Sequence, residues 1–235
     1  MKKIFTLFML VLLAFILVGC DKDDPIIEAP TTYASATLEF AVFELIENYR
    51  TADNYGVKLT SDDGETTLVT EIKMNKTGTA INSMAYTQTG GESDMHVYIS
   101  ENMAYMLTVD GDKIKYSAGA TEQAAILSSY GFAKFIEDVE ALLLDDAALY
   151  AALPASVDVT NNVATFALDL LTYSGTYFTE ADSANLKITF TGTAISAIEI
   201  EVTKASVVMS NKVEFLGTTA QTVTLPADAA SYVAQ

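Results

Sequence analysis

The chain has 235 residues, a formal net charge of −18 at pH 7, and a composition that is 50% hydrophobic. Such an acidic surface repels phosphate backbones and anionic lipid headgroups, which argues against nucleic-acid binding and against attachment through a basic patch. Cys20 is the only cysteine and His96 the only histidine. Disulfides within the chain and multi-histidine zinc sites are therefore excluded.

The first twenty residues, MKKIFTLFMLVLLAFILVGC, have the order of a bacterial lipoprotein leader. Lys2 and Lys3 form a short positive region, and the apolar run after them is as long as a signal-peptide core but short for a membrane-spanning helix. The ending Leu-Val-Gly-Cys resembles a lipobox. We expect residues 1–19 to be a signal peptide and Cys20 to carry diacylglycerol, which anchors the chain on the extracytoplasmic face of the cell membrane. Cleavage leaves 216 residues with a formal charge of −20, so attachment depends on acyl chains.

Residues 20–35 form the lipidated cysteine and an acidic segment with two prolines, which we interpret as a flexible tether. A short edge strand at Ile26 and Ile27 is the alternative for this segment. Beyond it, apolar residues recur at i, i+4, i+7, i+8 and i+11, which predicts an amphipathic helix that ends at Asp53. These residues are Leu38, Val42, Leu45, Ile46 and Tyr49.

The following sixty residues alternate between apolar and polar side chains, which predicts an antiparallel meander. The segments Ser-Asp-Asp-Gly at 61–64 and Asp-Gly-Asp at 110–112 have the composition of turns and lack the ligand spacing of a calcium loop. The strands are expected near 57–60, 68–74, 79–87, 95–99, 103–109 and 113–117.

The period changes to a helical one at residue 121. We expect a helix over 121–130 that ends at Gly131, a second over 132–143, and either an extension or a third short helix over 147–152. Strands then return near 157–159, 166–170, 186–190, 198–209, 213–215 and 223–225, with turns at Asn161-Asn162 and Ser210-Asn211 and a loop at 174–184.

These elements predict one α+β domain over residues 36–228 and a C-terminal tail over 229–235. A sheet of ten or eleven long antiparallel strands is expected to curl strongly, with the helices available to cover one of its faces. We expect the domain to be a monomer.

Catalytic signatures are absent from the sequence: there is no G-x-S-x-G, no P-loop and no G-x-G-x-x-G. His96 falls in mid-strand on the less apolar face and is expected to face solvent. We expect a protein that is not an enzyme and that needs no cofactor or metal. A carboxylate-dependent hydrolase remains a remote alternative, because paired carboxylates leave no sequence motif.

The apolar phase of the sheet includes several methionines, whose flexible and polarisable side chains suit sites for variable apolar ligands. The alternative is that they are ordinary core residues. The candidate ligand-binding residues are Leu68, Ile72, Met74, Met95, Val97, Met103, Tyr105, Leu107, Phe132, Phe135, Phe166, Leu168, Ile188, Phe190 and Phe215.

Two segments, MHVYISENMAYMLTVDGDKIKYSAG (95–119) and EFLGTTAQTVTLPAD (214–228), together with the order of elements, resemble the LolA-like superfamily. This superfamily includes the mycobacterial lipoproteins LppX and LprG and related Gram-positive surface lipoproteins. The resemblance implies a half-barrel, in which helices lie on the concave side of the sheet and the gap between them holds an acyl chain or a lipid-linked molecule. No ligand residue carries over one for one. A non-enzymatic structural or interaction lipoprotein with a fully packed core is the alternative function.

Overall fold

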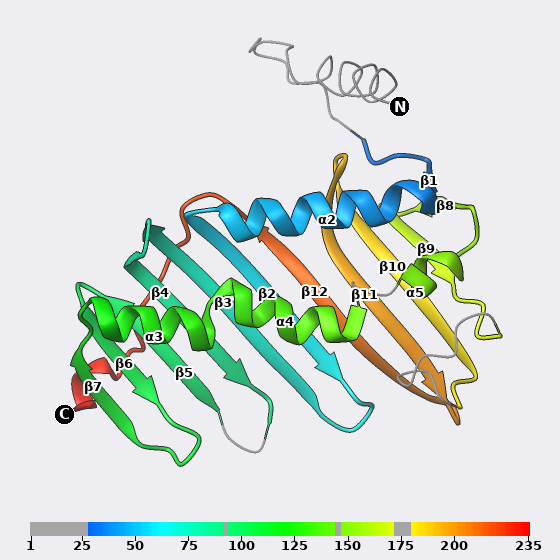
Figure 1. Cartoon of the computed structure of the whole chain (residues 1–235). Coiled ribbons are helices and arrows are strands. Elements are labelled where there is room, and N and C mark those ends of the chain that lie inside the picture. The colour runs from blue at the N-terminus through cyan, green and yellow to red at the C-terminus, as the bar shows by residue number, and fades with distance from the viewer. Residues whose placement is uncertain (1–27, 92–93, 144–146, 172–179) are drawn as a thin grey trace, which may run out of the picture.

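The computed structural model describes residues 28–91, 94–143, 147–171 and 180–235, except for the side chains of 138–143, 147 and 148. Within these residues the protein is α+β, with one large sheet and a few helices (Figure 1). The sheet has 13 strands in the order β1-β8-β9-β10-β11-β12-β2-β3-β4-β5-β6-β7-β13 and is not closed into a barrel. Every neighbouring pair is antiparallel except β7 and β13.

The strands form two meanders that meet in the middle of the sheet. The first comprises β2 (Asn54–Asp62), β3 (Thr67–Thr77), β4 (Ala80–Thr89), β5 (Met95–Ser100), β6 (Met103–Leu107) and β7 (Lys113–Ser117). The second comprises β8 (Ser156–Thr160), β9 (Val163–Ala167), β10 (Ser183–Thr191), β11 (Ala194–Lys204) and β12 (Val207–Gly217). Strand β12 pairs with β2, which sets Val57 opposite Phe215 and Leu59 opposite Val213.

The helices connect parts of the sheet that lie far apart. Helix α2 (Ser35–Thr51) leads from the edge strand β1 to the central strand β2. Helices α3 (Ala120–Tyr130), α4 (Phe132–Leu143) and α5 (Ala147–Ala151) lie between β7 and β8, which are near opposite edges. The helical segment therefore has to cross the sheet, and Figure 1 shows α2, α3 and α4 on the same side of it.

Helix α2 confirms the amphipathic pattern of the sequence. Leu38, Val42, Ile46 and Tyr49 are buried at helical spacing, and all four belong to one apolar cluster with strand residues. The Tyr49 ring meets the Phe215 ring edge-on at 5.1 Å, and its hydroxyl accepts a hydrogen bond from Gly217 N at 2.7 Å. The expected helices over 121–130 and 132–143 are also confirmed as α3 and α4.

The edges of the sheet differ from the expectation of ten or eleven strands. Strand β1 (Thr32–Ala34) pairs with β8, although the sequence assigned it to the tether. Strand β13 (Val233–Ala234), which follows the short 3-10 helix η2 (Ala229–Ser231), pairs with β7, although it falls in the expected tail. Both strands are too short to show a period, and each exists because an unpaired edge lies beside it. The sheet therefore extends beyond the expected 36–228 boundaries.

The C-terminal third also differs from its expected strands. The hairpin between β11 and β12 turns at Ala205 and Ser206, with φ of 50° and 69°, whereas Ser210 and Asn211 lie inside β12. A positive φ is unfavourable for alanine, so the dipeptide gives no turn signal. No strand forms over residues 223–225.

Candidate hydrophobic-ligand site

Strand register defines a helix-side face of the sheet. Val57, Ile72, Tyr86 and Val97 lie opposite one another across β2, β3, β4 and β5, so their side chains share a face. Val57, Ile72 and Val97 are at most 1% exposed and join the helix residues in one core cluster. The resemblance to the LolA-like superfamily implies a hydrophobic ligand on this side of the sheet, between the strands and the helices.

Hydrogen bonds fasten the helices to this face. Phe132 N, at the start of α4, donates to Tyr55 Oη at 3.0 Å, and burial raises the pKa of Tyr55 to about 12. In α3, Gln123 Oε1 accepts from Ile81 N at 2.9 Å, and its Nε2 donates to Ala118 O at 3.0 Å. A buried glutamine with both ends paired fixes how α3 sits on β4.

Ten of the fifteen candidate ligand residues are core residues, each at most 9% exposed. They lie in the same apolar cluster as the inward side chains of α2, so they are packed against protein atoms. These ten are Ile72, Met74, Val97, Phe132, Phe135, Phe166, Leu168, Ile188, Phe190 and Phe215.

Three candidates lie on the other face. Val97 pairs with Met106, and Ile99 pairs with Ala104, so Met103, Tyr105 and Leu107 point away from the helices. The prediction of which β6 side chains face the helices was wrong. All five residues of Met103–Leu107 are apolar or aromatic, so no polar residue indicates which side chains point outward. Ala104 and Met106 are the residues of this strand that face the helix side.

The opposite face at β5 and β6 is covered by the C-terminal segment. Tyr232 is 3% exposed, lies edge-on to the Tyr105 ring at 5.8 Å, and shares a hydrogen bond with His96 Nε2. Asp228 forms an ion pair with Lys113 on the same side. His96 is therefore half-buried, whereas the sequence predicted that it faces solvent.

A groove opens on the helix-side face at the ends of β2, β3 and β12. Its volume is about 690 Å³, and its surface is mostly apolar. Leu68, one of the candidates, lies there with Met209, which packs against the core cluster. The lining residues are Ser61, Asp62, Asp63, Thr66, Leu68, Gly90, Gly91, Met209 and Asn211.

Two glycines leave room in this groove. A Cβ at Gly90, where φ is +90°, would lie 1.9 Å from Thr67 O, so only glycine permits this approach of the backbone. A Cβ at Gly91 would be 3.4 Å from Leu68 Cδ1. A larger residue at Gly91 would therefore occupy space beside the Leu68 side chain.

The acidic residues at the rim form a turn, as the sequence predicted. Asp62 Oδ1 accepts from Gly64 N at 2.8 Å, and Asp63 Oδ1 accepts from Thr66 N at 2.8 Å and Glu65 N at 3.0 Å. These backbone donors hold the pKa of Asp63 below its usual value. One carboxylate oxygen of each aspartate accepts backbone hydrogen bonds within the turn. The rim therefore carries negative charge whose role is to hold the turn.

Sequence reasoning missed Met209 and Asn211. Both share the helix-side phase with Val213 and Phe215 in β12, as their partners Val202 and Ile200 show. The alternation of side chains along β12 would have placed both residues on the helix side. The turn expected at Ser210-Asn211 divided this strand in the prediction, so the alternation was not followed through it.

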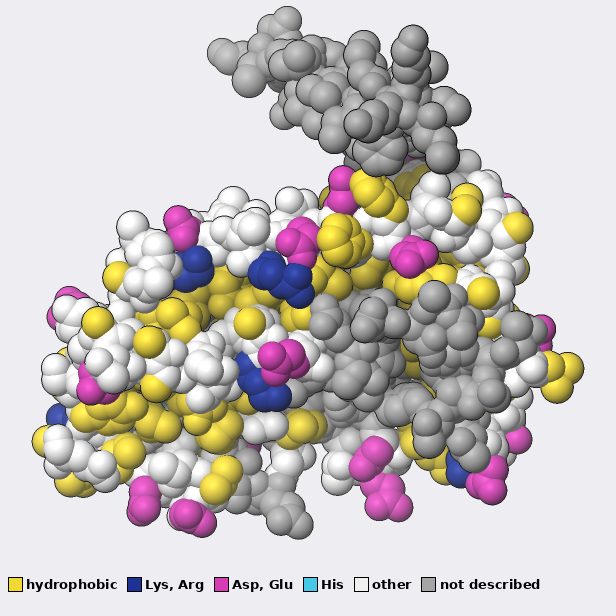
Figure 2. Space-filling view, viewed as in Figure 1, with side chains coloured by type: hydrophobic (Ala, Val, Ile, Leu, Met, Phe, Trp, Pro, Cys, Tyr) yellow, Lys and Arg dark blue, Asp and Glu magenta, His cyan; other side chains and the backbone are white. Residues whose placement is uncertain are grey.

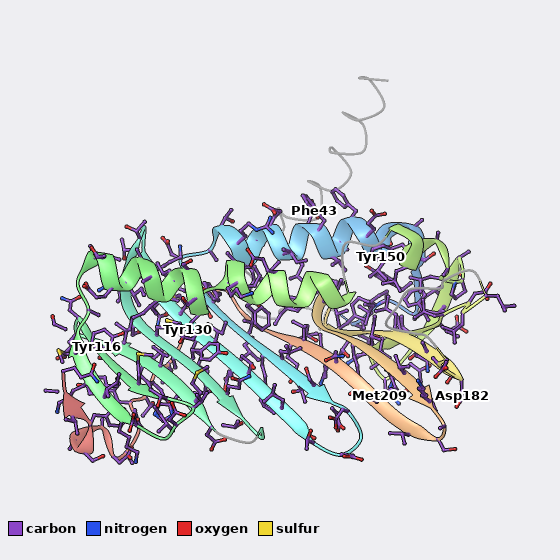
Figure 3. All side chains as sticks on the ribbon, turned by 60° about the horizontal axis from the view of Figure 1, so that its bottom comes forward. Phe43, Tyr116, Tyr130, Tyr150, Asp182 and Met209 are labelled. Atoms are coloured by element: carbon purple, nitrogen blue, oxygen red, sulfur yellow. The ribbon has the colours of Figure 1, made fainter. Side chains whose placement is uncertain are left out.

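A half-exposed aromatic surface lies on the same face beside α3. The rings of Tyr86 and Tyr130 are 4.9 Å apart, and Tyr116 Oη lies 3.3 Å from Met106 Sδ. Burial, with Tyr130 nearby, raises the pKa of Tyr116. Figure 2 shows hydrophobic side chains below α3 over this end of the sheet, and Figure 3 shows Tyr116 and Tyr130 there. Met95, the remaining candidate, is half-buried and shares the phase of Val97.

No group of three or more metal-ligating side chains occurs among the described residues. None of the helices in that part of the chain is long and apolar enough to span a membrane. Residues 1–19, Cys20 and the alternative strand at Ile26 and Ile27 lie outside the described residues, as does most of the expected loop at 174–184. No family model matches the chain, and the search of curated proteins found no match.

Proposed function

We propose that the chain is a bacterial lipoprotein, anchored through diacylglyceryl-Cys20 to the extracytoplasmic face of the cell membrane, whose domain binds or carries a hydrophobic ligand. The ligand class is an acyl chain, a lipid or a lipid-linked molecule. The groove beside Leu68 and Met209 carries this proposal, because it continues the apolar helix-side face out to solvent. Its volume of about 690 Å³ falls within the roughly 300–1,000 Å³ of small-molecule sites.

We further infer a LolA-like half-barrel, with a strongly curved sheet whose concave side is covered by the helices. The open antiparallel sheet supports this, as does the helical segment between two meanders that pair in the middle. In this proposal α3, α4 and α5 form a lid over a ligand held between the sheet and the helices, whereas none of their described residues lines the groove beside Leu68 and Met209. Each methylene that a ligand buries contributes about 0.8 kcal/mol, before the cost of ordering the chain.

The packing of the core decides where such a ligand fits. Met74 and Ile188 are fully buried, and both belong to the core cluster that joins strand and helix residues. This favours the groove and the half-exposed tyrosines over the interior. It also supports the second candidate, a structural or interaction lipoprotein with a packed core, which would recover no lipid.

Fluorescence of a dansyl-labelled long-chain fatty acid tests the proposal. Met209→Trp should fill the groove and weaken binding about tenfold or more, since each 1.4 kcal/mol of lost burial is a factor of ten. Met103→Trp is the matched control, because Met103 is also a half-buried strand methionine but lies on the opposite face. Both variants should keep the wild-type circular dichroism spectrum.

Two results would overturn this assignment. Equal fatty-acid affinity in the two variants would show that the groove is not the site. No binding by the wild type, together with no lipid in an organic extract of the purified protein, would favour the structural alternative.

A further inference from the structure

Helix α2 has a second apolar surface that faces away from the sheet. Phe40 and Phe43 are 59% and 60% exposed, although Leu38 and Val42 on the other side of the helix are buried. Residues three apart are neighbours on a helix surface, so the two rings form one patch. Figure 3 shows Phe43 pointing away from the sheet, and Figure 2 shows hydrophobic side chains among acidic ones along this helix.

The chain is fixed to the sheet shortly before this helix. Ala29 packs against the core cluster, Thr31 O accepts a hydrogen bond from Val159 N at 2.8 Å, and β1 pairs with β8. The tether is therefore shorter than the sequence suggested. The stretch from Cys20 to Ala29 can span at most about 30 Å when fully extended.

This short connection places α2 near the anchor. If Cys20 is held by its acyl chains, the start of α2 stays within reach of the bilayer surface. Phe40 and Phe43 follow Ser35 by about 7 and 12 Å along the helix axis at 1.5 Å per residue. The patch is thus at the end of the domain that the anchor keeps closest to lipid.

Charge indicates the kind of lipid surface that fits. Helix α2 carries Glu39, Glu44 and Glu47 but only one basic residue, Arg50, which pairs with Glu47. Attraction to anionic headgroups cannot hold this helix on a membrane, so contact has to come from apolar side chains entering the interface. A neutral phosphatidylcholine surface suits the patch better than an anionic one.

We propose that Phe40 and Phe43 insert into the headgroup region of the membrane that carries the Cys20 anchor, and so seat α2 on the bilayer. This inference rests on the anchor in the proposed function but does not depend on the ligand groove. It gives the domain a fixed orientation on the membrane in addition to its tether.

The absence of tryptophan from the chain makes the test direct. Phe43→Trp and Val109→Trp each introduce a single tryptophan, and Val109, 58% exposed between β6 and β7, is the control. The full chain, lipidated in a bacterial host, is reconstituted into phosphatidylcholine vesicles with or without brominated acyl chains. We expect bromine to quench the tryptophan fluorescence of the Phe43→Trp variant at least about twofold more than that of the Val109→Trp variant. Adding Phe40→Ser to the Phe43→Trp variant should reduce this quenching. Replacing part of the phosphatidylcholine with an anionic lipid should also reduce it.

The same samples separate failure of the inference from failure of the anchor. Protein that does not float with the vesicles would contradict the anchor at Cys20. If the protein floats while the indole of the Phe43→Trp variant stays as open to aqueous acrylamide as that of the Val109→Trp variant, membrane insertion alone is overturned. Shielding of the indole at position 43 without bromine quenching, with a dimer in analytical ultracentrifugation, would assign the patch to a second copy and also overturn it.

Discussion

The face of the sheet opposite the helices differs between its two halves. Across β10 to β12 and β2 it carries ion pairs, with Lys187 Nζ 2.6 Å from Glu201 and Lys212 Nζ 3.1 Å from Glu214. Across β5 and β6 it carries aromatic side chains, which Tyr232 covers from the C-terminal segment. Periodicity identifies the helix side correctly on the half whose other face carries ion pairs. It fails in β6, where both faces are apolar or aromatic because Tyr232 covers the second one.

The largest effect should come from the helix-side core. Ile72→Ala removes a side chain that is 1% exposed between Val57 and Tyr86. It should lower the free energy of unfolding by about 2–5 kcal/mol, because the packed surroundings cannot collapse into the cavity. Lys187→Ala, on the open half of the other face, should change it by less than about 1 kcal/mol. Urea denaturation followed by circular dichroism measures both, and similar losses would contradict the difference between the faces.

An intermediate effect should come from the covered half of that face. Tyr232→Ala removes the ring that shields His96 and Tyr105, and it should cost about 2 kcal/mol by lost apolar burial. Hydrogen exchange should then speed up in β7 and β13. A change as small as that of Lys187→Ala would mean that the C-terminal segment does not pack on the sheet in solution.

The smallest effect should be a pH dependence at His96. Burial lowers the pKa of His96, Lys113 lowers it further, and Asp228 and Asp94 oppose the shift. The unfolded chain then binds the proton more readily, so stability falls as the pH drops below the ordinary value of about 6.5 toward the folded pKa. His96→Gln should reduce this fall in urea denaturation between about pH 7.5 and 5.5. An unchanged pH profile in the variant would assign the fall to carboxylates such as Asp228, whose pKa Lys113 lowers.

The sequence by itself determined most of the elements. Helical spacing from Leu38 to Tyr49 located α2, and the apolar stripes after residue 121 located α3 and α4. Asn161 and Asn162 marked a hairpin, because asparagine tolerates the positive φ that both adopt. These features depend on neighbours within a few residues, so local chemistry is sufficient to predict them.

Tertiary structure alone decided which phase of β6 faces the helices, where the edge strands form, and where the groove opens. Met106 faces the helix side, whereas Tyr105 faces Tyr232, a residue more than a hundred positions away. Leu68 and Met209 line one groove because β3 and β12 both pair with β2, an arrangement that no local pattern encodes. Alternation shows that a strand has two faces, but burial on each face is set by the segments that fold onto it.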